Sequence, residues 1–511
     1  MPQCTSEFLT SCKLIHNPSA SQLREMARHE EKTTCYGSPS YISKVRNRSA
    51  KNTYIVDNGL LGVDQKGISR AEADKIVLRV HEYLKGRELI CMDKRLGQHP
   101  NFHVRCRLII TSEYARIPLM WNNLLFDADN ENFVPELTSV HVPEWPQRII
   151  LVYPEDAITY ILGTDYFGET KKSFLRMALY LWKKRGGIGF HAGSKVLRVY
   201  NYKGILEEVG FIIFGLSGTG KTSLTIHDHG LTGEERAIIR QDDIVMMDKS
   251  GYCYGTENGF YIKTEGLDET QRVLYRAATS PNAILENVKV LDDGTVLFDN
   301  TELTSNGRYV ILRNEVELTD DRIDLDKANR IIFITRRDDI IPPVAKLNAA
   351  QAAAYFMLGE SIETSAGDPT KAGQSKREVG TNPFIIGREP EEGNRLLSIL
   401  KNHPDMECYL LNTGSVGAGS ARGAKKITVA VSANIMKQIA KGTIKWAADP
   451  DWDYQVPVEV PEMEVGDYTP TNYFSPEQYR ERVERLRRER LQWLAKYSGL
   501  NEEIIRAVQL A

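Results

Sequence analysis

Short apolar runs alternate with helical stretches from about residue 54 to residue 200. Runs such as ELICMD, RLIITS and RIILVY are rich in aliphatic residues, which is typical of buried strands. The segment SRAEADKIVLRVHEYL, residues 69–84, instead places its apolar residues at helical spacing behind a serine N-cap. Because strands that alternate with helices usually pack in layers, this part of the chain predicts an α/β layer.

A second series of apolar runs begins near residue 195, where KVLRVYNY, VGFIIFG, AIIRQDDIVMMD and GYCYG follow one another. These runs lie close together in the sequence, which favours a mixed sheet over a regular βαβ series. A chain of 511 residues is also too long for one hydrophobic core. We therefore predict an α/β protein of two to four domains, with a second half that begins near residue 195.

Two polar segments interrupt the second half of the chain. Residues 359–383 are rich in glycine, serine and threonine, a composition typical either of a surface loop or of an active-site lid. Residues 475–497 predict a helix, because Ser475 is a good N-cap, Pro476 suits the first turn and Gln478 completes a capping box. We interpret the arginine and glutamate run of this helix as a solvated face rather than as an RNA-binding surface.

The composition argues against several classes of function. The net charge is −3 and the isoelectric point is near 6.4, so the chain lacks the basic surplus of nucleic-acid-binding proteins. Its apolar runs are shorter than the roughly 18 residues that a membrane span needs, and the N-terminus lacks the apolar core of a signal peptide. The seven cysteines are scattered and form no CxxC pair, which suits a reducing compartment. We expect a cytoplasmic protein without a nucleic-acid or membrane partner.

The segment GLSGTGKT, residues 215–222, matches the phosphate-binding pattern G-x-x-x-x-G-K-[ST]. Its glycines allow the backbone to turn successive N–H groups inward, and the helix that follows presents its positive end to phosphate. Lys221 supplies a charge for the β and γ oxygens, and the hydroxyl of Thr222 can bind Mg²⁺. The apolar run GFIIF before the loop predicts the strand that such a loop needs. These residues predict a nucleotide site.

Further candidate residues stand outside the loop, and their spacing alone does not assign them a role. Asp242 and Asp243 follow the run AIIRQ, at the kind of strand end where a second metal ligand is expected. A lone histidine is usually structural, and adjacent lysines usually face solvent. The other candidates are Arg48, Tyr166, Lys171, Lys172, His191 and Arg308.

Taken in order, these segments resemble ATP-dependent phosphoenolpyruvate carboxykinase. That family combines a loop of the form G-L-S-G-T-G-K-T with an upstream G-T-x-Y-x-G-E-x-K-K segment, a histidine between the two, and downstream L-E-N-V and P-P-V-x-x-L segments. The corresponding segments here are GLSGTGKTS, GTDYFGETKKS, FHAGSK, QDDI, AILENVKV, SNGRYVI, IIPPVAKLNAAQAAAYFMLG, NTGSVGAG and FSPEQYRER. The match is collinear from about residue 40 to residue 490. The GTP-using class is less similar, because its loop carries a cysteine.

The resemblance implies a two-domain carboxykinase-like fold with mixed sheets. Residues 1–194 would form an N-terminal substrate-binding α/β domain, and residues 195–511 a C-terminal mononucleotide-binding domain that contains the phosphate loop. Residues 359–383 would be a mobile lid. The reaction implied is a carboxy-lyase step of gluconeogenesis, in which oxaloacetate loses CO₂ and the enolate takes a phosphoryl group from ATP to give phosphoenolpyruvate and ADP.

The resemblance also implies roles for individual residues. Cations must hold a dicarboxylate and stabilise an enolate, and metal ions must bridge the enolate oxygen and the γ-phosphate. The residues implied to contact substrate are Arg48, Tyr166, Lys171, Lys172, Ser217 and Arg308. Those implied to bind nucleotide are Gly215, Leu216, Ser217, Gly218, Thr219, Gly220, Lys221, Thr222, Ser223, Lys263, Lys426, Ile427 and Ser432. The metal ligands implied are Lys172, His191 and Asp243 for Mn²⁺, and Thr222 for the Mg²⁺ of the nucleotide.

Several segments depart from the family pattern. R-S-P-K-D-K-Y is replaced by RSAKNTY, H-C-S-A-N by HAGSK and G-D-D-E-H-G by RQDDIVM, which changes the neighbours of the implied metal ligands. On the adenine side K-R-I-S-I-K-D-T becomes KKITVAVS, so Lys426 and Ser432 stand where the family has arginine and threonine. A glutamate that the family uses near ATP has no clear counterpart around residues 269–273. These changes leave the true phosphoryl donor open.

Two other functions remain open on the sequence. A phosphate-loop kinase of the same fold would phosphorylate another small molecule or a protein serine. A nucleotide-binding regulatory protein would bind without turnover, but such a protein needs no cage for an enolate, and the residues that would form one are retained. They are Arg48, Tyr166, Lys172, His191, Asp243 and Arg308. We therefore expect the carboxykinase reaction first and the kinase reaction second.

Overall fold

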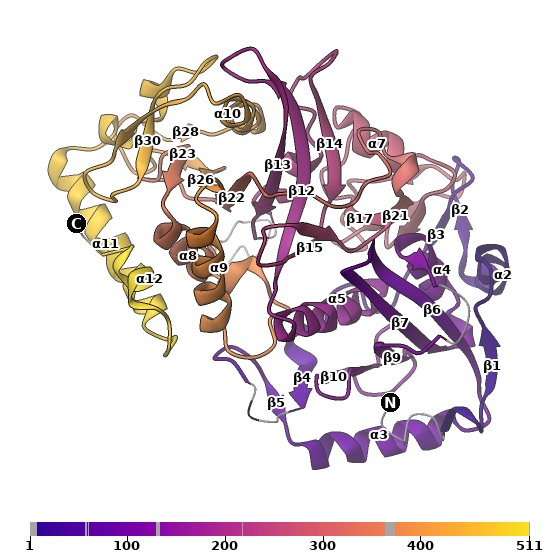
Figure 1. Cartoon of the computed structure of the whole chain (residues 1–511). Helices are drawn as coiled ribbons and strands as arrows, with labels where there is room; N and C mark the ends of the chain where they lie inside the picture. The colour runs from indigo at the N-terminus through magenta and orange to yellow at the C-terminus, as the bar shows by residue number, and fades with distance from the viewer. Residues whose placement is uncertain are drawn as a thin grey trace. The chain divides into compact units, whose positions relative to one another are not determined.

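The computed structural model describes residues 8–56, 59, 61–128, 133–216, 218–362 and 374–509 (Figure 1). The chain divides into two compact units. Unit 1 contains Met1–Lys184 and Thr256–Ile323, and unit 2 contains Arg185–Gly255 and Asp324–Ala511. The single boundary predicted between residues 194 and 195 differs from this division, because it falls within strand β12 (Ile188–Tyr200) and because residues 256–323 return to unit 1.

The main sheet of unit 1 has the strand order β1-β6-β7-β9-β11-β10-β4-β5, and β8 pairs with β6 in addition. Its neighbours are both parallel, as in β7 with β9, and antiparallel, as in β6 with β7. The strands are β1 (Lys13–His16), β4 (Thr53–Val56), β5 (Gly67–Ile68), β6 (Glu88–His99), β7 (Phe102–Thr111), β8 (Phe126–Asp127), β9 (Leu137–Val142), β10 (Ile149–Tyr153) and β11 (Ile158–Leu162).

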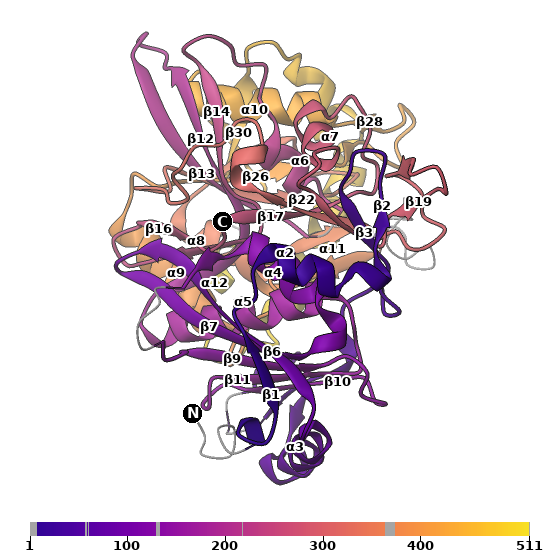
Figure 2. The same ribbon diagram turned by 90° about the vertical axis from the view of Figure 1, so that its right-hand side faces the viewer.

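Helices cover both faces of this sheet. Side chains of β9 alternate between its faces, so Val140 packs with Val80 of α3 (Arg70–Leu84), while Ser139 bonds to Ser173 of α5 (Phe167–Lys184). Figure 2 shows α3 and α5 on opposite sides of the strands β7, β9 and β11. The other helices of unit 1 are α2 (Ala20–Met26), α4 (Arg116–Leu124) and α7 (Arg272–Ala278).

A second sheet in unit 1 joins the returning segment to the N-terminal part of the chain. Its order is β17-β21-β18-β3-β2, and the pairing of β18 with β3 places Glu286 opposite Tyr41. The strands are β2 (Lys32–Thr33), β3 (Pro39–Tyr41), β17 (Gly259–Lys263), β18 (Ile284–Glu286) and β21 (Arg308–Leu312). Between β18 and β21 the chain forms a separate short pair, β19 (Lys289–Val290) and β20 (Val296–Leu297).

The main sheet of unit 2 has the order β16-β15-β12-β13-β22-β26-β23-β30-β29, with β14 paired to β12. The central strands β13, β22 and β26 are parallel, and their outer neighbours are antiparallel. The mixed α/β character predicted from the sequence is therefore confirmed. The strands other than β12 are β13 (Leu206–Phe214), β14 (Arg236–Gln241), β15 (Ile244–Met247), β16 (Cys253–Gly255), β22 (Arg330–Thr335), β23 (Val344–Leu347), β26 (Glu407–Asn412), β29 (Lys445–Ala448) and β30 (Gln455–Glu459).

Two hydrophobic layers enclose the central strands of unit 2. In β13 the side chain of Ile212 joins one layer and that of Ile213 the other, as the two-residue period of a strand requires. The first layer contains α8 (Ala349–Leu358), α9 (Pro390–Asn402), α11 (Pro476–Leu494) and α12 (Glu502–Arg506), and the second contains α6 (Lys221–Ile226) and α10 (Val429–Lys441). Two short antiparallel pairs complete the unit, namely β24 (Glu360–Ile362) with β25 (Ser375–Arg377) and β27 (Ser415–Val416) with β28 (Lys425–Lys426).

The elements with the clearest periodicity are confirmed. Ser69 is the N-cap of α3, and Ser475 and Gln478 form the predicted capping box of α11. The solvated face predicted for α11 is wrong at Arg490, which is fully buried and forms an ion pair with Glu360. A buried carboxylate in another element draws this arginine inward, and the sequence of α11 alone contains no sign of that partner.

The predicted lid, residues 359–383, lies partly outside the described residues, which omit 363–373. The flanking residues form the antiparallel pair β24 and β25, and the role of a lid stays a prediction. In the part of the chain that the structure describes, we find no helix both long enough and apolar enough to cross a membrane.

Candidate functional site

The phosphate loop of unit 2 connects β13 to α6. Gly218 and Gly220 have φ angles of 82° and 98°, a left-handed region that costs other residues free energy and that glycine occupies freely. Helix α6 begins at Lys221, so Lys221 and Thr222 lie in its first turn. Ser217, predicted to lie near substrate, falls outside the described residues.

Neighbouring strands brace the loop through its backbone. The hydroxyl of Thr219 donates to Leu216 O at 2.7 Å, and the hydroxyl of Thr413, just after β26, donates to Thr219 O at 2.7 Å. Arg336, just after β22, donates from Nη1 to Gly218 O at 2.9 Å. Because β13, β22 and β26 are parallel, these contacts come from the carboxyl ends of adjacent strands, where α/β sheets bind ligands.

Sequence reasoning did not single out Arg336 or Thr413. Arg336 follows the apolar strand RIIFIT and Thr413 follows ECYLLN. A polar residue directly after a buried parallel strand was the available signal, but it becomes useful only once the order of the strands is known.

Two of the three residues predicted on the adenine side, Lys426 and Ile427, pair with the segment that follows Thr413. Ile427 is buried and its N–H donates to Gly414 O at 2.8 Å, so the segment after β28 is tied to the segment that holds the loop. Lys426 is exposed on β28. Ser432 lies in the first turn of α10 and is 1% exposed. The described contacts link Ile427 to the loop, whereas a nucleotide contact of Ser432 stays a prediction.

His191 and Asp243 lie side by side in unit 2. His191 is on β12 and Asp243 follows β14, and His191 Nε2 lies 3.1 Å from Asp243 Oδ1. The other ring nitrogen, Nδ1, lies 2.7 Å from Thr381 O. Since a carbonyl only accepts, Nδ1 carries a proton and Nε2 is the nitrogen directed at the carboxylate.

This pair is the part of the predicted metal site that unit 2 supplies. An imidazole nitrogen and a carboxylate oxygen are both ligands that Mn²⁺ accepts. Among the described residues, no group of three or more histidine, cysteine, aspartate or glutamate side chains is arranged to hold a metal ion. The third predicted ligand, Lys172, belongs to unit 1.

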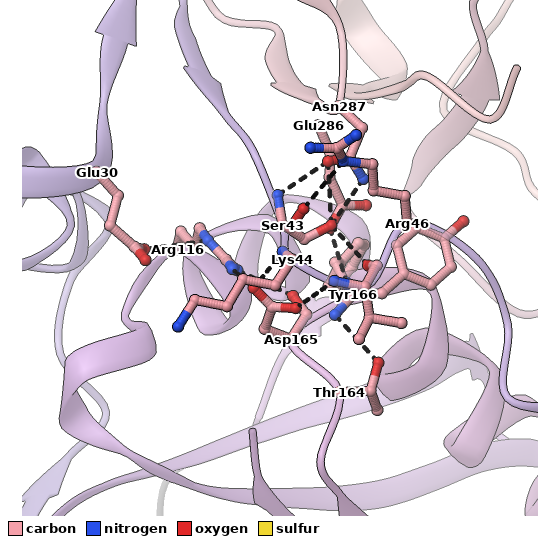
Figure 3. Close-up of polar contacts among 12 residues, drawn as sticks. Glu30, Ser43, Lys44, Arg46, Arg116, Thr164, Asp165, Tyr166, Glu286 and Asn287 are labelled. Carbon is pink, nitrogen blue, oxygen red and sulfur yellow. Dashed lines mark hydrogen bonds and ion pairs between the residues drawn. The ribbon is translucent and has the colours of Figure 1, made fainter. Parts of the chain in front are cut away.

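In unit 1 a short segment that carries the predicted Arg48 is held by several hydrogen bonds. The carboxylate of Asp165 accepts from Lys44 N at 2.8 Å and from Val45 N at 2.9 Å, and Arg116 donates to the same carboxylate at 2.7 Å (Figure 3). Further along, Ser49 N donates to Glu169 at 2.7 Å. Because both acids belong to the GTDYFGETKKS segment, that segment sets the position of residues 44–49.

Asn306 connects three of the elements that carry predicted residues. Its Nδ2 donates to Tyr166 Oη and to Arg46 O, both at 2.9 Å. Its Oδ1 accepts from Arg308 Nη2 at 3.0 Å and from Nε at 3.2 Å. The guanidinium of Arg308 also lies over the ring of Tyr261, 5.3 Å from its centre. Tyr166 and Arg308 are therefore brought together by a residue that sequence reasoning did not name.

The two adjacent lysines of α5 have different surroundings. Lys171 is buried and its Nζ lies 2.6 and 2.5 Å from the two oxygens of Glu257, which is also buried. Lys172 is partly exposed, because successive residues of a helix point about 100° apart. Lys263 of β17 stands opposite Arg308 of β21 and forms an ion pair with Glu265. Glu257, which sequence reasoning missed, gives Lys171 a fixed partner, and the predicted substrate contact of Lys171 stays a prediction.

Glu286 is a second buried acid that sequence reasoning missed. It accepts hydrogen bonds from Phe167 N at 2.8 Å and from Tyr261 Oη at 2.5 Å, and it stands opposite Arg308 in the pairing of β18 with β21. Burial raises the pKa of Glu286 to about 7, and its hydrogen bonds from Tyr261 and Phe167 oppose this shift. The LENV segment contains this glutamate, but only the fold reveals its partners.

The predicted residues thus form two groups. Unit 1 holds Arg48, Tyr166, Lys171, Lys172, Lys263 and Arg308, and unit 2 holds the phosphate loop, His191, Asp243, Lys426, Ile427 and Ser432. Within unit 1 Tyr166 and Arg308 are joined through Asn306, and within unit 2 the phosphate loop is held by residues at the carboxyl ends of the parallel strands, while His191 and Asp243 form a separate pair. Cations that hold anions in one group and a phosphate loop in the other are what transfer of a phosphoryl group to an anionic acceptor requires.

Comparison with known proteins gives a consistent picture. The sequence model of the family described as phosphoenolpyruvate carboxykinase matches residues 12–465. A protein of Aeropyrum pernix named phosphoenolpyruvate carboxykinase (ATP) is 32% identical over 496 residues, which cover 96% of this chain and 95% of that protein. Proteins with the same name are 26% identical in Caldanaerobacter subterraneus, over 95% of both chains, and 28% identical in Brucella melitensis, over 75% of this chain and 72% of that protein.

The family match therefore runs through both units and includes all the segments that build the two groups of residues. The chain belongs to the ATP-dependent phosphoenolpyruvate carboxykinase family.

Proposed function

We propose that this protein is an ATP-dependent phosphoenolpyruvate carboxykinase. It would decarboxylate oxaloacetate and transfer the γ-phosphoryl group of ATP to the resulting enolate, giving phosphoenolpyruvate, ADP and CO₂. The observation that carries the proposal is the family match over residues 12–465, within which the chain retains every residue implied to contact substrate and metal. The kinase alternative is not favoured, because the relatives described above all carry the name phosphoenolpyruvate carboxykinase (ATP).

Unit 1 would hold the oxaloacetate. Arg48 and Arg308 would bind carboxylate and phosphoryl oxygens, for which a planar guanidinium is well suited. Asn306 supports this role of Arg308, because its Oδ1 accepts from Nε and Nη2 and so fixes the plane of the guanidinium. Tyr166 and Lys171 would contact the substrate, and the positive charges around the cleaved carboxylate would stabilise the enolate that forms.

Unit 2 would hold the nucleotide. The N–H groups of the loop and Lys221 would bind the phosphates, and Lys263 of unit 1 would add a charge to them. Lys426, Ile427 and Ser432 would lie on the adenine side. The replacement of arginine and threonine by Lys426 and Ser432 makes the choice of donor a part of the proposal to be tested with ATP, GTP, ADP and pyrophosphate.

Two divalent ions are implied by the reaction. His191, Asp243 and Lys172 would hold Mn²⁺, with Lys172 bound as the neutral amine, and Thr222 would hold the Mg²⁺ of the nucleotide. The pairing of His191 Nε2 with Asp243 at 3.1 Å fits such a site. Bound there, the ions would neutralise negative charge between the enolate and the γ-phosphate.

The remaining assignments follow from this function. Substrate binding is proposed for the unit that contains Arg48 and Arg308, nucleotide binding for the unit that contains the phosphate loop, and lid closure for residues 359–383. A cytoplasmic location is proposed because the chemistry uses cytoplasmic metabolites and because the cysteines that the structure describes carry free thiols.

The purified chain should be tested with oxaloacetate, ATP, Mn²⁺ and Mg²⁺, with phosphoenolpyruvate and CO₂ measured together. We expect both products, and their formation should depend on both substrates. A parallel reaction without oxaloacetate measures simple hydrolysis of ATP. Turnover of ATP that leaves oxaloacetate untouched would reject the carboxykinase and favour the kinase alternative.

A further inference from the structure

A lysine that the proposed chemistry does not use lies behind the phosphate loop. Lys195 is on β12, four residues after His191, and it is 0% exposed. Its Nζ lies 3.0 Å from Leu224 O, 2.6 Å from His227 O and 2.8 Å from His229 Nε2. A buried lysine must have such partners, because an ammonium without them would cost several kcal/mol.

The hydrogen-bonding roles around Lys195 follow from its partners. His229 Nδ1 lies 2.9 Å from Ala433 O, which can only accept, so Nδ1 carries the ring proton. Burial, with the adjacent Lys195 as a second cause, holds the pKa of His229 well below its usual value, so the ring is neutral and Nε2 accepts. Burial lowers the pKa of Lys195 well below its usual value, whereas the three acceptors that face Nζ favour the ammonium form, which alone has three N–H groups to satisfy them.

These contacts join three elements of the candidate nucleotide site. Leu224 and His227 lie at the carboxyl end of α6, whose first turn carries Lys221 and Thr222. Ala433 belongs to α10 and follows Ser432, the predicted adenine-side residue. One ammonium group therefore links β12, the phosphate helix and, through His229, the adenine-side helix.

Helix α6 depends on contacts of this kind for its position. It has six residues, far fewer than the roughly 12 to 15 that an isolated helix needs to be marginally stable. A cation at its carboxyl end satisfies carbonyl groups that lack partners within the helix and opposes the negative end of its dipole. Helix α6 also lies very close to β12 at Gly193, because a Cβ there would lie 2.2 Å from Thr225 Oγ1. Strand β12 thus provides the surface against which α6 packs.

We propose that Lys195 is a positioning residue that fixes the phosphate helix α6 against the adenine-side helix α10, and thereby sets the affinity for the nucleotide without touching it. The inference rests on the proposed function to the extent that it takes this loop as the nucleotide site. It goes beyond the family pattern, because Lys195 stands where the H-C-S-A-N pattern has asparagine. An asparagine is too short to reach the three acceptors that Lys195 contacts.

The test compares Lys195→Met and Lys195→Asn with a matched control in the full-length protein. Lys94 is also a buried lysine on a strand, 3% exposed, but it lies on β6 of unit 1, so Lys94→Met controls for the loss of a buried ammonium. Calorimetric titration with Mg²⁺ and ATP gives the dissociation constant, and steady-state assays give the KM for oxaloacetate. Thermal unfolding and amide exchange of residues 218–226 report on folding and on α6.

We expect both Lys195 variants to bind the nucleotide at least about tenfold more weakly, a change that corresponds to 1.4 kcal/mol. Amide exchange in α6 should be faster. The KM for oxaloacetate should stay within about twofold of the wild-type value. Lys94→Met should keep the wild-type affinity. Folded Lys195 variants with wild-type nucleotide affinity, or with nucleotide affinity and KM weakened equally, would overturn the proposal.

A second variant tests the proposal if the Lys195 variants do not fold. His229→Asn removes the bridge to α10 but leaves Lys195 its two carbonyl partners, so it should weaken nucleotide binding by a smaller factor while the protein stays folded. Unchanged binding in this variant would also overturn the proposal. If the wild-type protein binds ATP yet leaves oxaloacetate unchanged, the proposed function fails while the role of Lys195 is still decided by the titrations.

Discussion

The side-chain amide of Asn306 helps to orient Arg308. Asn306 Oδ1 accepts from both Nε and Nη2 of Arg308, and such a pair of N–H groups fixed in one plane is a property of the guanidinium that an ammonium lacks. The same amide donates to Tyr166 Oη. At the scale of single residues, the proposed binding of oxaloacetate therefore needs a guanidinium at position 308 rather than a positive charge alone.

Replacement of Arg308 by lysine tests this point. Arg308→Lys keeps the charge but loses the fork, and we expect kcat/KM for oxaloacetate to fall by about 100-fold or more, the loss typical of removing one donor to a developing oxyanion. Arg272→Lys, on the exposed surface of α7, is the matched control and should retain its activity. Steady-state kinetics decides, and a loss of less than threefold in Arg308→Lys would remove Arg308 from the site.

Glu286 gives a prediction about pH. Its pKa is raised to about 7 in the folded protein, above the 4.5 of the unfolded chain, so the folded state binds the proton more tightly. Between these two values the folded state holds more protons than the unfolded state, and the free energy of unfolding therefore decreases as the pH rises. The stabilising effect of the proton is complete below the lower value and is lost as the pH passes 7.

Glu286→Gln removes this titration and keeps most of the shape. We expect the variant to gain stability relative to the wild type as the pH rises from 5 to 8, because only the wild type must ionise a buried acid at the higher pH. Urea unfolding of both proteins at several pH values measures the difference. A difference in unfolding free energy that stays constant over this range would show that Glu286 does not titrate there.

Single residues of the site could be predicted from the sequence where they belong to a recognisable motif. They could not be predicted where their role depends on a contact with a residue far away in the sequence. Lys221, Thr222, His191 and Asp243 follow from motifs, and the structure places each pair together. Asn306 and Glu286 lie in segments that the sequence marked, but their roles come from Tyr166 and Phe167, which are more than 100 positions away. No local pattern encodes such a contact.

At the scale of elements, the phosphate loop depends on backbone angles that only glycine adopts at low cost. Gly220 has a φ of 98° and no atom lies within 4 Å of a Cβ built there, so an alanine would fit but would strain the backbone by about 1–2 kcal/mol. The strain can be relieved by moving the first turn of α6, which carries Lys221 and Thr222.

Gly220→Ala should therefore weaken the binding of Mg²⁺ and ATP by at least about tenfold, or 1.4 kcal/mol. Gly499→Ala is the matched control, because Gly499 has a φ of 87° and also no atom within 4 Å of its Cβ position, but it lies outside the loop. Both variants should lose similar stability in thermal unfolding, and only Gly220→Ala should lose affinity. Equal affinities in the two variants would contradict the assigned role of the loop.

Elements were predictable where their periodicity is local. The helix that starts after Ser69 and the capping box of α11 follow from a few neighbouring residues, and so do the strands before and after the phosphate loop. The return of residues 256–323 to unit 1 was missed, because it depends on β18 pairing with β3, nearly 250 positions earlier. Strand pairing at such a separation leaves no mark in the apolar pattern of either strand.

At the scale of the whole molecule, the predicted residues are divided between two units. The cations proposed for oxaloacetate lie in unit 1, and the phosphate loop with His191 and Asp243 lies in unit 2. Neither group alone can couple the loss of CO₂ to the transfer of phosphate. The central claim is therefore a claim about the complete chain, which must convert both reactants together.

The most direct measurement follows the γ-phosphorus of ATP by ³¹P NMR in the presence of oxaloacetate, Mn²⁺ kept at trace level to limit line broadening, and Mg²⁺. The account predicts that this phosphorus moves to phosphoenolpyruvate, with ADP, CO₂ and phosphoenolpyruvate formed in equal amounts. It also predicts that Arg308→Lys and Asp243→Ala abolish or strongly slow the transfer while the proteins stay folded. Phosphorus that appears as inorganic phosphate or on another acceptor, with oxaloacetate left intact, would contradict the account.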